Sequence, residues 1–338
     1  MPQLHENVLE IRDLKTYFYG EEGELPAVDG VSLSVQRGKV LAIVGESGCG
    51  KSVTSFSVLR LIQEPGRIVG GQILLYPKDG RIIDVTALGR KADVLFDVRG
   101  GLVSMIFQEP MTALSPVHSV GNQICEAIRL HQAVSSRQAE EMAVEMLGKV
   151  GIPGPAERMR QYPHELSGGM RQRVIIAMAL VCKPELLIAD EPTTALDVTI
   201  QAQVLGLVKQ LQSELGAGVL FVTHDLAVVA QMADDVAVMY LGRIVEKGDV
   251  RAVLKDPMHP YTMALLKSLP GLSKPGEPLP SISGSVPFLT DMPTGCPFHP
   301  RCRYVQAGRC DIGGPPQLRE IAEGHFAACI RAEEIRQQ

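Results

Sequence analysis

The sequence predicts an α/β fold built on a buried parallel sheet, and three features indicate it. Three short apolar runs, VLAIV from Val40, LLIA from Leu186 and VLFVT from Val219, have the length of strands covered on both faces. A glycine-rich turn follows the first run. Stretches of helical period separate the runs, and strands that alternate with helices are typical of parallel sheets with crossover connections.

Composition limits the classes of protein and partner. The chain has 338 residues, enough for one large domain with an appendage or for two domains. Its 33 basic residues against 38 acidic ones give a net charge of −5, so we expect no nucleic-acid partner. The N-terminus lacks an apolar signal segment, and no run of 18 apolar residues occurs. We therefore expect a chain in the cytosol with no transmembrane segment.

Two further regions accompany the predicted sheet. The first 40 residues contain VLEIRDLKTYF and VDGVSLSV, whose alternation predicts short antiparallel strands, an N-terminal β subdomain. From Val120 to Val150 apolar residues recur at spacings of three and four, which predicts helices. We expect a helical subdomain over about residues 110–180.

The segment GESGCGKS, from Gly45 to Ser52, matches the phosphate-binding loop (P-loop) pattern G-x-x-x-x-G-K-[ST]. Its glycines let backbone N–H groups face a phosphate, and the helix N-terminus adds partial positive charge. An ordinary glycine-rich turn is the alternative, which the preceding strand and following helix disfavour. Lys51 is expected to reach the β- and γ-phosphates, and the Ser52 hydroxyl to bind Mg²⁺. The predicted ATP-binding residues of this loop are Gly45, Ser47, Gly48, Cys49, Gly50, Lys51 and Ser52.

A second acidic site is predicted where LLIADEP ends a strand. Asp190 is expected to hold Mg²⁺, and Glu191 to orient and polarise the attacking water as a catalytic residue. Two solvated acids at a strand end are the alternative, which the P-loop upstream disfavours.

The segment LSGGMRQR, from Leu166 to Arg173, predicts a helix capped by Ser167 with an anion-binding start. Placed between the P-loop and the Asp190 strand, it resembles the signature sequence of ABC-type ATPases, with Met170 where glutamine is usual. The resemblance implies that Ser167, Gly168 and Gly169 bind the ATP held on a partner's P-loop.

Other motifs of that family follow in order. Gln108 in IFQEP resembles the glutamine that senses Mg²⁺ and faces the membrane subunits, which implies a catalytic and metal-binding role. The segment TALD, ending at Asp197, is similar to the D-loop that borders ATP. His224 in VTHD resembles the catalytic switch histidine that contacts the γ-phosphate. Phe18 resembles the aromatic residue that stacks on adenine.

This resemblance covers roughly residues 7–250 and implies a mechanism. Two such domains pair head to tail, with ATP and Mg²⁺ between the P-loop of one and the Ser-Gly-Gly segment of the other. The γ-phosphate charge is satisfied only when both domains contribute donors, so ATP binding closes the pair and hydrolysis opens it.

The C-terminal sequence narrows the family. The segments VLKDPMHPYTMALLKSLP and CPFHPRC resemble the extension of dipeptide/oligopeptide importer ATPases. We expect an ATPase domain over residues 1–255 and an extension over 256–338, with a proline-rich linker. The resemblance implies an ATPase that powers import of di- and oligopeptides from the cytoplasmic face of the membrane, where it lies peripherally. The implied partners are two transmembrane permease subunits, an extracytoplasmic peptide-binding protein, and a second homologous ATPase in a heterodimer or a second copy in a self-dimer.

Two alternative functions remain at this stage. Related ATPases serve transporters of nickel or other small solutes, and nothing in this chain touches the cargo. The other alternative is a non-transport ABC ATPase, which the importer-type tail disfavours.

Four cysteines gather near the C-terminus in the pattern C-x₅-C-x₇-C-x₁₈-C, at Cys296, Cys302, Cys310 and Cys329. Four thiolates are a complete ligand set for a [4Fe–4S] cluster or for Zn²⁺, and this spacing fits neither a zinc ribbon nor a common ferredoxin. Family members with this tail resemble iron–sulfur proteins, which favours [4Fe–4S], with Zn²⁺ as the alternative. We expect the metal to compensate for a segment with too little apolar mass to fold alone.

The remaining cysteines and the nearby histidines are expected to have other roles. Cys49, Cys125 and Cys182 are predicted to be packing residues. His299 and His325 flank the cysteine set and could replace a ligand, although four cysteines suffice.

Overall fold

The computed structural model describes residues 5–21, 23–89, 91–108, 113–194, 197–269 and 282–337. The chain divides into two compact units. The first, here called the helical unit, comprises Met1–Leu9, Val35–Lys39 and Leu75–Phe221. The second, here called the P-loop unit, comprises Glu10–Ser34, Val40–Leu74 and Val222–Gln338.

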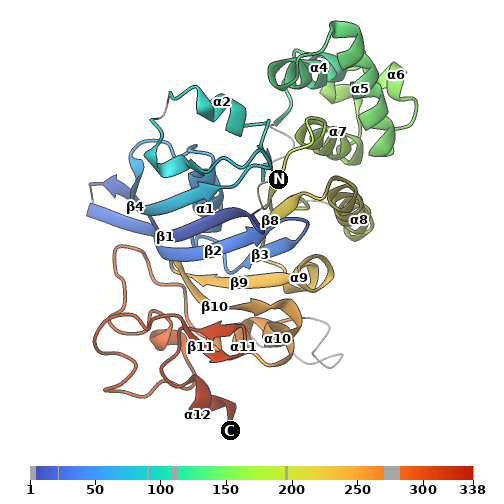
Figure 1. The fold of residues 1–338 in the computed structure, drawn as a ribbon. Helices are drawn as coiled ribbons and strands as arrows, with labels where there is room; N and C mark the ends of the chain where they lie inside the picture. The colour runs from blue at the N-terminus through green and yellow to red at the C-terminus, as the bar shows by residue number, and fades with distance from the viewer. Residues whose placement is uncertain are drawn as a thin grey trace. The chain divides into compact units, whose positions relative to one another are not determined.

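Parallel strands and a group of helices form the helical unit. Strands β6 and β7 pair in parallel, with Val103 opposite Leu186, and every residue of β7 is buried. Helices α4, α5, α6 and α7 gather beside one another (Figure 1). The elements are β5 (Ile83–Asp84), β6 (Val103–Ile106), β7 (Leu186–Asp190), most of β8 (Gly218–Thr223), α2 (Val94–Val98), α4 (Val120–His131), α5 (Ser136–Lys149), α6 (Pro155–Arg158), α7 (Gly168–Leu180) and α8 (Val198–Leu215), with 3-10 turns at Val85–Ala87 and Pro163–Glu165.

Local signals set the ends of these helices. The Ser119 hydroxyl accepts the Asn122 N–H at 3.3 Å and starts α4. A capping box formed by Ser135 and Gln138 starts α5. Helix α8 stops at Gly216, whose φ of +62° is left-handed, as is common after a last helical turn. The helices predicted from Val120 to Val150 are confirmed.

Two sheets form the P-loop unit. In the larger one the strands lie in the order β11-β12-β10-β9-β3. Strand β3 is parallel to β9, and the pairs β9/β10, β10/β12 and β11/β12 are antiparallel. In the smaller one β2, β1 and β4 are neighbours. The elements are β1 (Asn7–Gly20), β2 (Gly23–Gln36), β3 (Val40–Val44), β4 (Gly66–Leu75), β9 (Asp235–Tyr240), β10 (Arg243–Asp249), β11 (Arg319–Ala322), β12 (His325–Ala327), α1 (Lys51–Val58), α9 (Leu226–Met232), α10 (Val250–Lys255), α11 (Pro260–Lys267) and α12 (Ala332–Arg336), with a 3-10 turn at His299–Arg301.

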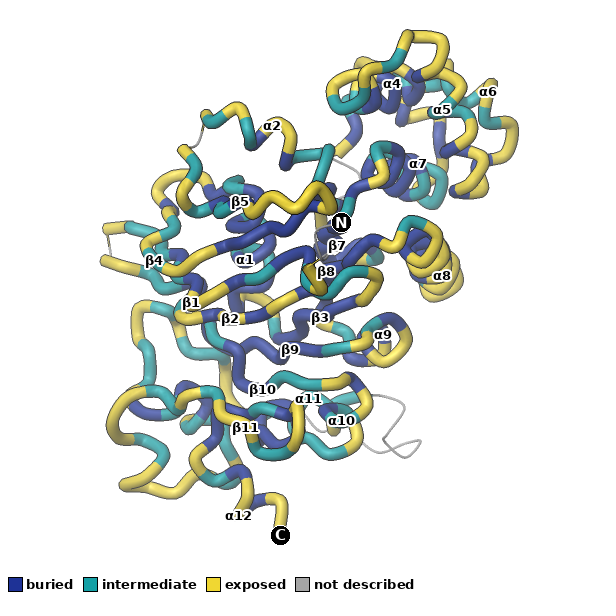
Figure 2. The backbone as a smooth tube through the Cα atoms, in the orientation of Figure 1, coloured by how far each residue is buried: buried dark blue, intermediate teal, exposed yellow. Residues whose placement is uncertain are grey.

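The C-terminal segment shares a core with this unit. Phe298 is 2% exposed and packs in one apolar cluster with Val238, Tyr240 and Tyr261. The three aromatic rings lie with centroids 4.7–5.4 Å apart, within the range of favourable aromatic pairs. Strand β3 is buried along its length, and β9 is buried from Val236 onward (Figure 2). The extension is therefore held by packing and by strand pairing, in addition to whatever a metal would contribute.

The structure extends the predicted architecture in two respects. Strands β1 and β2 have 14 residues each and are not short. Strands β4, β5, β6, β9, β10, β11 and β12 were not predicted. Most of the proline-rich linker, residues 270–281, lies outside the described residues. Within the described part of the chain, no helix combines the length and apolar composition needed to cross a bilayer.

Candidate functional site

The loop Gly45–Ser52 joins β3 to α1, and close backbone approach explains its glycines. A Cβ on Gly45 would lie 2.2 Å from the Met239 carbonyl oxygen. A Cβ on Gly50 would lie 2.2 Å from the Ala27 carbonyl oxygen, and its φ of +104° strains any other residue. The strand, loop and helix required by the P-loop pattern are therefore present.

The Lys51 ammonium lies inside the curl of this loop. The side chain is 5% exposed, and Nζ donates to the carbonyl oxygens of Gly45 at 2.8 Å and Glu46 at 3.0 Å. Burial raises the pKa of the Cys49 thiol, which is consistent with a packing role. Ser52 lies in the first helical turn and is half-buried.

Two side chains from later in the chain hold Glu46 within the loop. Its backbone N–H donates to the Tyr261 hydroxyl at 2.9 Å. Its carboxylate accepts hydrogen bonds from Arg301 at 2.7 and 3.0 Å, and the Arg301 side chain is 4% exposed. The guanidinium also faces the ring of Tyr240, 5.9 Å from its centroid. Sequence analysis did not identify Arg301 or Tyr261, because neither belongs to a nucleotide-binding motif.

The predicted catalytic acid lies in the helical unit beside the predicted catalytic glutamine. Asp190 ends β7 and is fully buried, and Glu191 follows at 9% exposure. The Glu191 carboxylate accepts hydrogen bonds from Gln108 Nε2 at 3.2 Å and from Thr194 Oγ1 at 3.0 Å. Its φ of +46° is unusual for a non-glycine residue, and such strain is concentrated at functional sites. Thr194 is a contact that sequence analysis missed.

The Ser-Gly-Gly segment forms the start of α7 and faces solvent. The Ser167 hydroxyl accepts the Met170 N–H at 3.4 Å and caps the helix, as predicted. Ser167 and Gly168 are exposed, and a Cβ on Gly168 would meet nothing within 4 Å. A Cβ on Gly169 would lie 3.6 Å from the Ile200 side chain, which is ordinary contact. The helix start thus has room for an anion.

The two other predicted nucleotide contacts lie at element ends. Asp197 caps α8, because its Oδ1 accepts the N–H groups of Thr199 at 3.1 Å and Ile200 at 3.0 Å. The preceding D-loop residues 195–196 lie outside the described residues. His224 follows β8 and is exposed.

Three consecutive aromatic residues of β1 have different surroundings. Phe18 lies so close to the backbone of Gly66 that a Cβ there would approach its ring within 2.6 Å. The Tyr17 hydroxyl donates to Asp29 at 3.0 Å, and burial, followed by this bond, raises the Tyr17 pKa to about 12. The Tyr19 ring lies under a guanidinium, 4.6 Å from its centroid. Both tyrosines are thus engaged by other side chains.

The four cysteines of the tail affect one another electrostatically. Burial, with a smaller contribution from the thiols of Cys329, Cys302 and Cys310, raises the pKa of Cys296 to about 12. The Cys296 N–H donates to the Cys310 carbonyl oxygen at 2.8 Å. Within the described ranges, however, no three His, Cys, Asp or Glu side chains are positioned around one metal ion.

The two neighbouring histidines have partners other than a metal. His325 Nε2 lies 2.7 Å from Glu246 Oε1, and both side chains are buried. Glu246 also accepts the N–H groups of Met258 at 2.7 Å and His259 at 2.9 Å. His299 Nδ1 lies 3.0 Å from the Cys296 carbonyl oxygen. Glu246 therefore links β10 to the tail strand β12.

Two known families match this chain. The ABC transporter family matches residues 28–194, and the family described as oligopeptide/dipeptide transporter, C-terminal region, matches residues 245–310.

Similar proteins extend the match over nearly the whole chain. A putative peptide import ATP-binding protein of Brucella ovis is 51% identical over 97% of this chain and 98% of its own. The oligopeptide transport ATP-binding protein OppD of Bacillus subtilis is 49% identical over 94% of this chain and 87% of its own. The dipeptide transport ATP-binding protein DppD of Escherichia coli is 45% identical over 95% and 96%.

Solved structures share the fold. A dimeric ATP-binding cassette in a post-hydrolysis state, bound to ADP and Pi, has a TM-score of 0.62 at 26% identity, covering 72% of this chain and 99% of that one. The cbiO1 protein of Clostridium perfringens, part of an ABC transporter complex, has the same score and identity over 75% and 92%.

Proposed function

This chain belongs to the ABC transporter family, among the ATP-binding proteins of peptide transporters, and we propose that it hydrolyses ATP to power import of di- and oligopeptides. The observation that carries the proposal is the 45–51% identity to peptide, oligopeptide and dipeptide import proteins along nearly the full length. Such identity includes the tail as well as the nucleotide-binding motifs.

The P-loop residues bind and orient the substrate ATP. Backbone N–H groups of Gly48, Cys49 and Gly50 face the phosphates, together with the start of α1. The Lys51 ammonium, held by carbonyl oxygens within the loop, neutralises the β- and γ-phosphates. Phe18 stacks on the adenine. The choice of Phe18 is supported by its two tyrosine neighbours, because Tyr17 bonds Asp29 and the Tyr19 ring lies under a guanidinium.

Glu191 acts as the base that orients the attacking water. The carboxylate is nearly buried, so it keeps a fixed direction, and Gln108 and Thr194 both donate to one of its oxygens. His224 contacts the γ-phosphate. Ser52, Asp190 and Gln108 would hold Mg²⁺, and their hydroxyl, carboxylate and amide oxygens are the donors this ion prefers. When bound, Mg²⁺ neutralises charge that develops on the phosphate oxygens.

The proposed assembly is a dimer on the cytoplasmic face of a membrane. The exposed start of α7, with Ser167, Gly168 and Gly169, binds the nucleotide of the partner ATPase, and Asp197 borders the same site. A homologous second ATPase is the favoured partner, and a second copy is the alternative. Two permease subunits and an external peptide-binding protein complete the transporter.

Cys296, Cys302, Cys310 and Cys329 are proposed to hold a [4Fe–4S] cluster, with Zn²⁺ as the alternative. Their mutual electrostatic influence supports a common site. In such a cluster each thiolate binds a different iron, so the four sulfurs need not surround one ion. When bound, the cluster would cross-link four points of the tail.

Transport by cells tests the function. Cells lacking this chain but retaining the rest of the transporter should take up a radiolabelled dipeptide only when the chain is restored. Uptake of ⁶³Ni²⁺ in the same cells tests the small-solute alternative. Restored nickel uptake without dipeptide uptake would contradict peptide import and leave ATP hydrolysis in place.

A further inference from the structure

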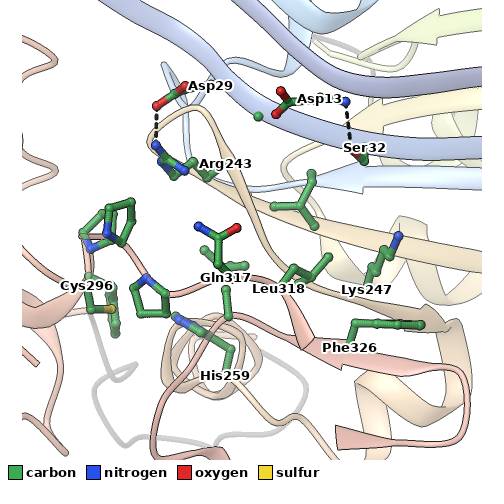
Figure 3. A pocket seen from close by; sticks show the side chains of 18 residues that line it. Asp13, Asp29, Ser32, Arg243, Lys247, His259, Cys296, Gln317, Leu318 and Phe326 are labelled. Atoms are coloured by element: carbon green, nitrogen blue, oxygen red, sulfur yellow. Dashed lines mark hydrogen bonds and ion pairs between the residues drawn. The ribbon is translucent and has the colours of Figure 1, made fainter. Parts of the chain in front are cut away.

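A cavity of about 350 Å³ lies in the P-loop unit and includes no residue of the P-loop (Figure 3). Its walls come from the β1–β2 hairpin, from β10 and from the tail. This volume is at the lower end of the range for small-molecule pockets. Phe326, Leu318 and Phe298 give it apolar walls.

Two cationic side chains of β10, Arg243 and Lys247, line the cavity. Lys247 is half-buried, and among the described residues no carboxylate pairs with it; its ammonium lies 5.1 Å from the Phe326 ring centroid. Arg243 pairs with Asp29 through Nη2, and among the described residues its buried Nε has no hydrogen-bond partner. Lys247 is therefore the lining cation that no described carboxylate neutralises.

The cavity is also lined by an exposed acidic side chain, that of Asp13. The Asp13 side chain is 69% exposed, and its pair with Lys15, 3.5 Å away on the surface, contributes little. Its backbone N–H donates to the Ser32 hydroxyl at 2.9 Å, which ties β1 to β2 beside the carboxylate (Figure 3). Asp29 is already neutralised by Arg243.

Apart from Cys296, which is a proposed cluster ligand, the lining groups carry balanced charge. Two carboxylates, Asp13 and Asp29, accompany two cations, Arg243 and Lys247, and burial lowers the pKa of His259 to about 3, so that it is neutral. Two carboxylates disfavour a polyphosphate, and a lone cation would leave Lys247 unmatched. A small zwitterion with an apolar side chain matches all of these features.

We propose that this cavity binds a short zwitterionic peptide of two or three residues. Its carboxylate pairs with Lys247, its ammonium pairs with Asp13, and an apolar side chain packs on Phe326 and Leu318. The Gln317 side chain, which lines the cavity and lies below Arg243 in the view of Figure 3, hydrogen-bonds the peptide backbone. An extended peptide of that length spans roughly 7–10 Å. This site is separate from ATP hydrolysis, and its test does not depend on transport.

Calorimetric titration of the full chain with alanyl-leucine tests the proposal. We expect saturable binding, weakened about tenfold when the peptide is N-acetylated or C-amidated, because each block removes one charge pair. Absence of saturable binding up to about 10 mM peptide would overturn the proposal. Inorganic phosphate binding more tightly than the dipeptide would also overturn it, as would equal binding of the doubly blocked peptide.

Two substitutions locate the site. Lys247→Met keeps the stem over Phe326 and removes the charge, and Asp13→Asn keeps a residue that tolerates the left-handed backbone found there. Each should weaken the free dipeptide about tenfold. Asp13→Asn should leave the N-acetylated peptide unaffected. Lys255→Met, at an exposed position of α10, is the matched control and should bind normally. Binding equal to wild type in both cavity variants would refute this location.

Discussion

Arg301 in the cysteine-bearing tail forms a two-pronged ion pair with Glu46 in the P-loop. Nη1 lies 2.7 Å from Oε2 and Nη2 lies 3.0 Å from Oε1, across 255 positions of sequence. Arg301 directly precedes Cys302, one of the predicted metal ligands. The ion pair therefore connects the cysteine-bearing segment to the phosphate-binding loop. The tail is thus positioned to set the shape of the loop that binds ATP.

Arg301→Gln should weaken ATP binding and reduce stability. It leaves a partly buried carboxylate unpaired in the loop, which we expect to cost about 3 kcal/mol of unfolding free energy and to raise the Kd for ATP about tenfold. Denaturant unfolding and titration with a fluorescent ATP analogue measure the two effects.

A double-mutant cycle with Glu46→Gln provides the control for that prediction. The double variant should lose less stability than the sum of the single variants, because each single change leaves an unpaired charge. Arg309→Gln breaks an exposed pair with Glu334 and should cost less than about 1 kcal/mol. Additive losses would show that Arg301 and Glu46 act independently.

Ser167→Ala should impair ATP-dependent dimerisation more than the loss of the α7 helix cap alone would explain. Loss of a serine cap costs about 1 kcal/mol of stability. Ser119→Ala removes the equivalent cap of α4 and is the matched control. Light scattering with ATP in a background that blocks hydrolysis should show dimers for the control variant and not for Ser167→Ala. Equal dimerisation of the two variants would show that Ser167 acts only as a helix cap.

Substitution of the tail cysteines should remove metal. Protein purified without oxygen should contain about four irons and acid-labile sulfide per chain. Cys296→Ser, and the same change at Cys302, Cys310 or Cys329, should lower that content, whereas Cys182→Ser should not. One zinc and no iron would favour the zinc alternative. Unchanged metal in all four variants would refute the ligand assignment.

Alkaline stability should report on Tyr17. Its pKa is raised to about 12 by burial and by the bond to Asp29, whereas an unfolded tyrosine titrates near about 10. The folded state therefore binds more protons between these values, and stability falls as pH rises through that window. Tyr17→Phe should show a shallower fall in the thermal midpoint between about pH 10 and 12. Parallel curves for both proteins would contradict the assignment.

Local sequence patterns were sufficient to predict the elements that carry the nucleotide motifs. Strands β3 and β7 coincide with the predicted apolar runs, apart from Asp190 at the end of β7. The Ser167 cap of α7 was predicted from a local signal of the same kind. These features depend on neighbours a few residues apart.

Long-range contacts were beyond the reach of such patterns. Strand β12 has only three residues and exists because it pairs with β10, with Glu246 opposite Ala327. The His325–Glu246 contact spans 79 positions, and no spacing rule relates the two. The tail was expected to lack apolar anchorage, yet Phe298 lies in the core of the P-loop unit, a placement that depends on tertiary packing.

The most direct test of the central claim is Glu191→Gln in the purified transporter. We predict that hydrolysis falls by about 10²–10⁴-fold while ATP stays bound, because the nucleotide contacts remain and the base is lost. Glu214→Gln, on an exposed face of α8, is the control and should hydrolyse normally. Turnover measured beside retained [α-³²P]ATP distinguishes the outcomes. Undiminished turnover by Glu191→Gln would contradict the account.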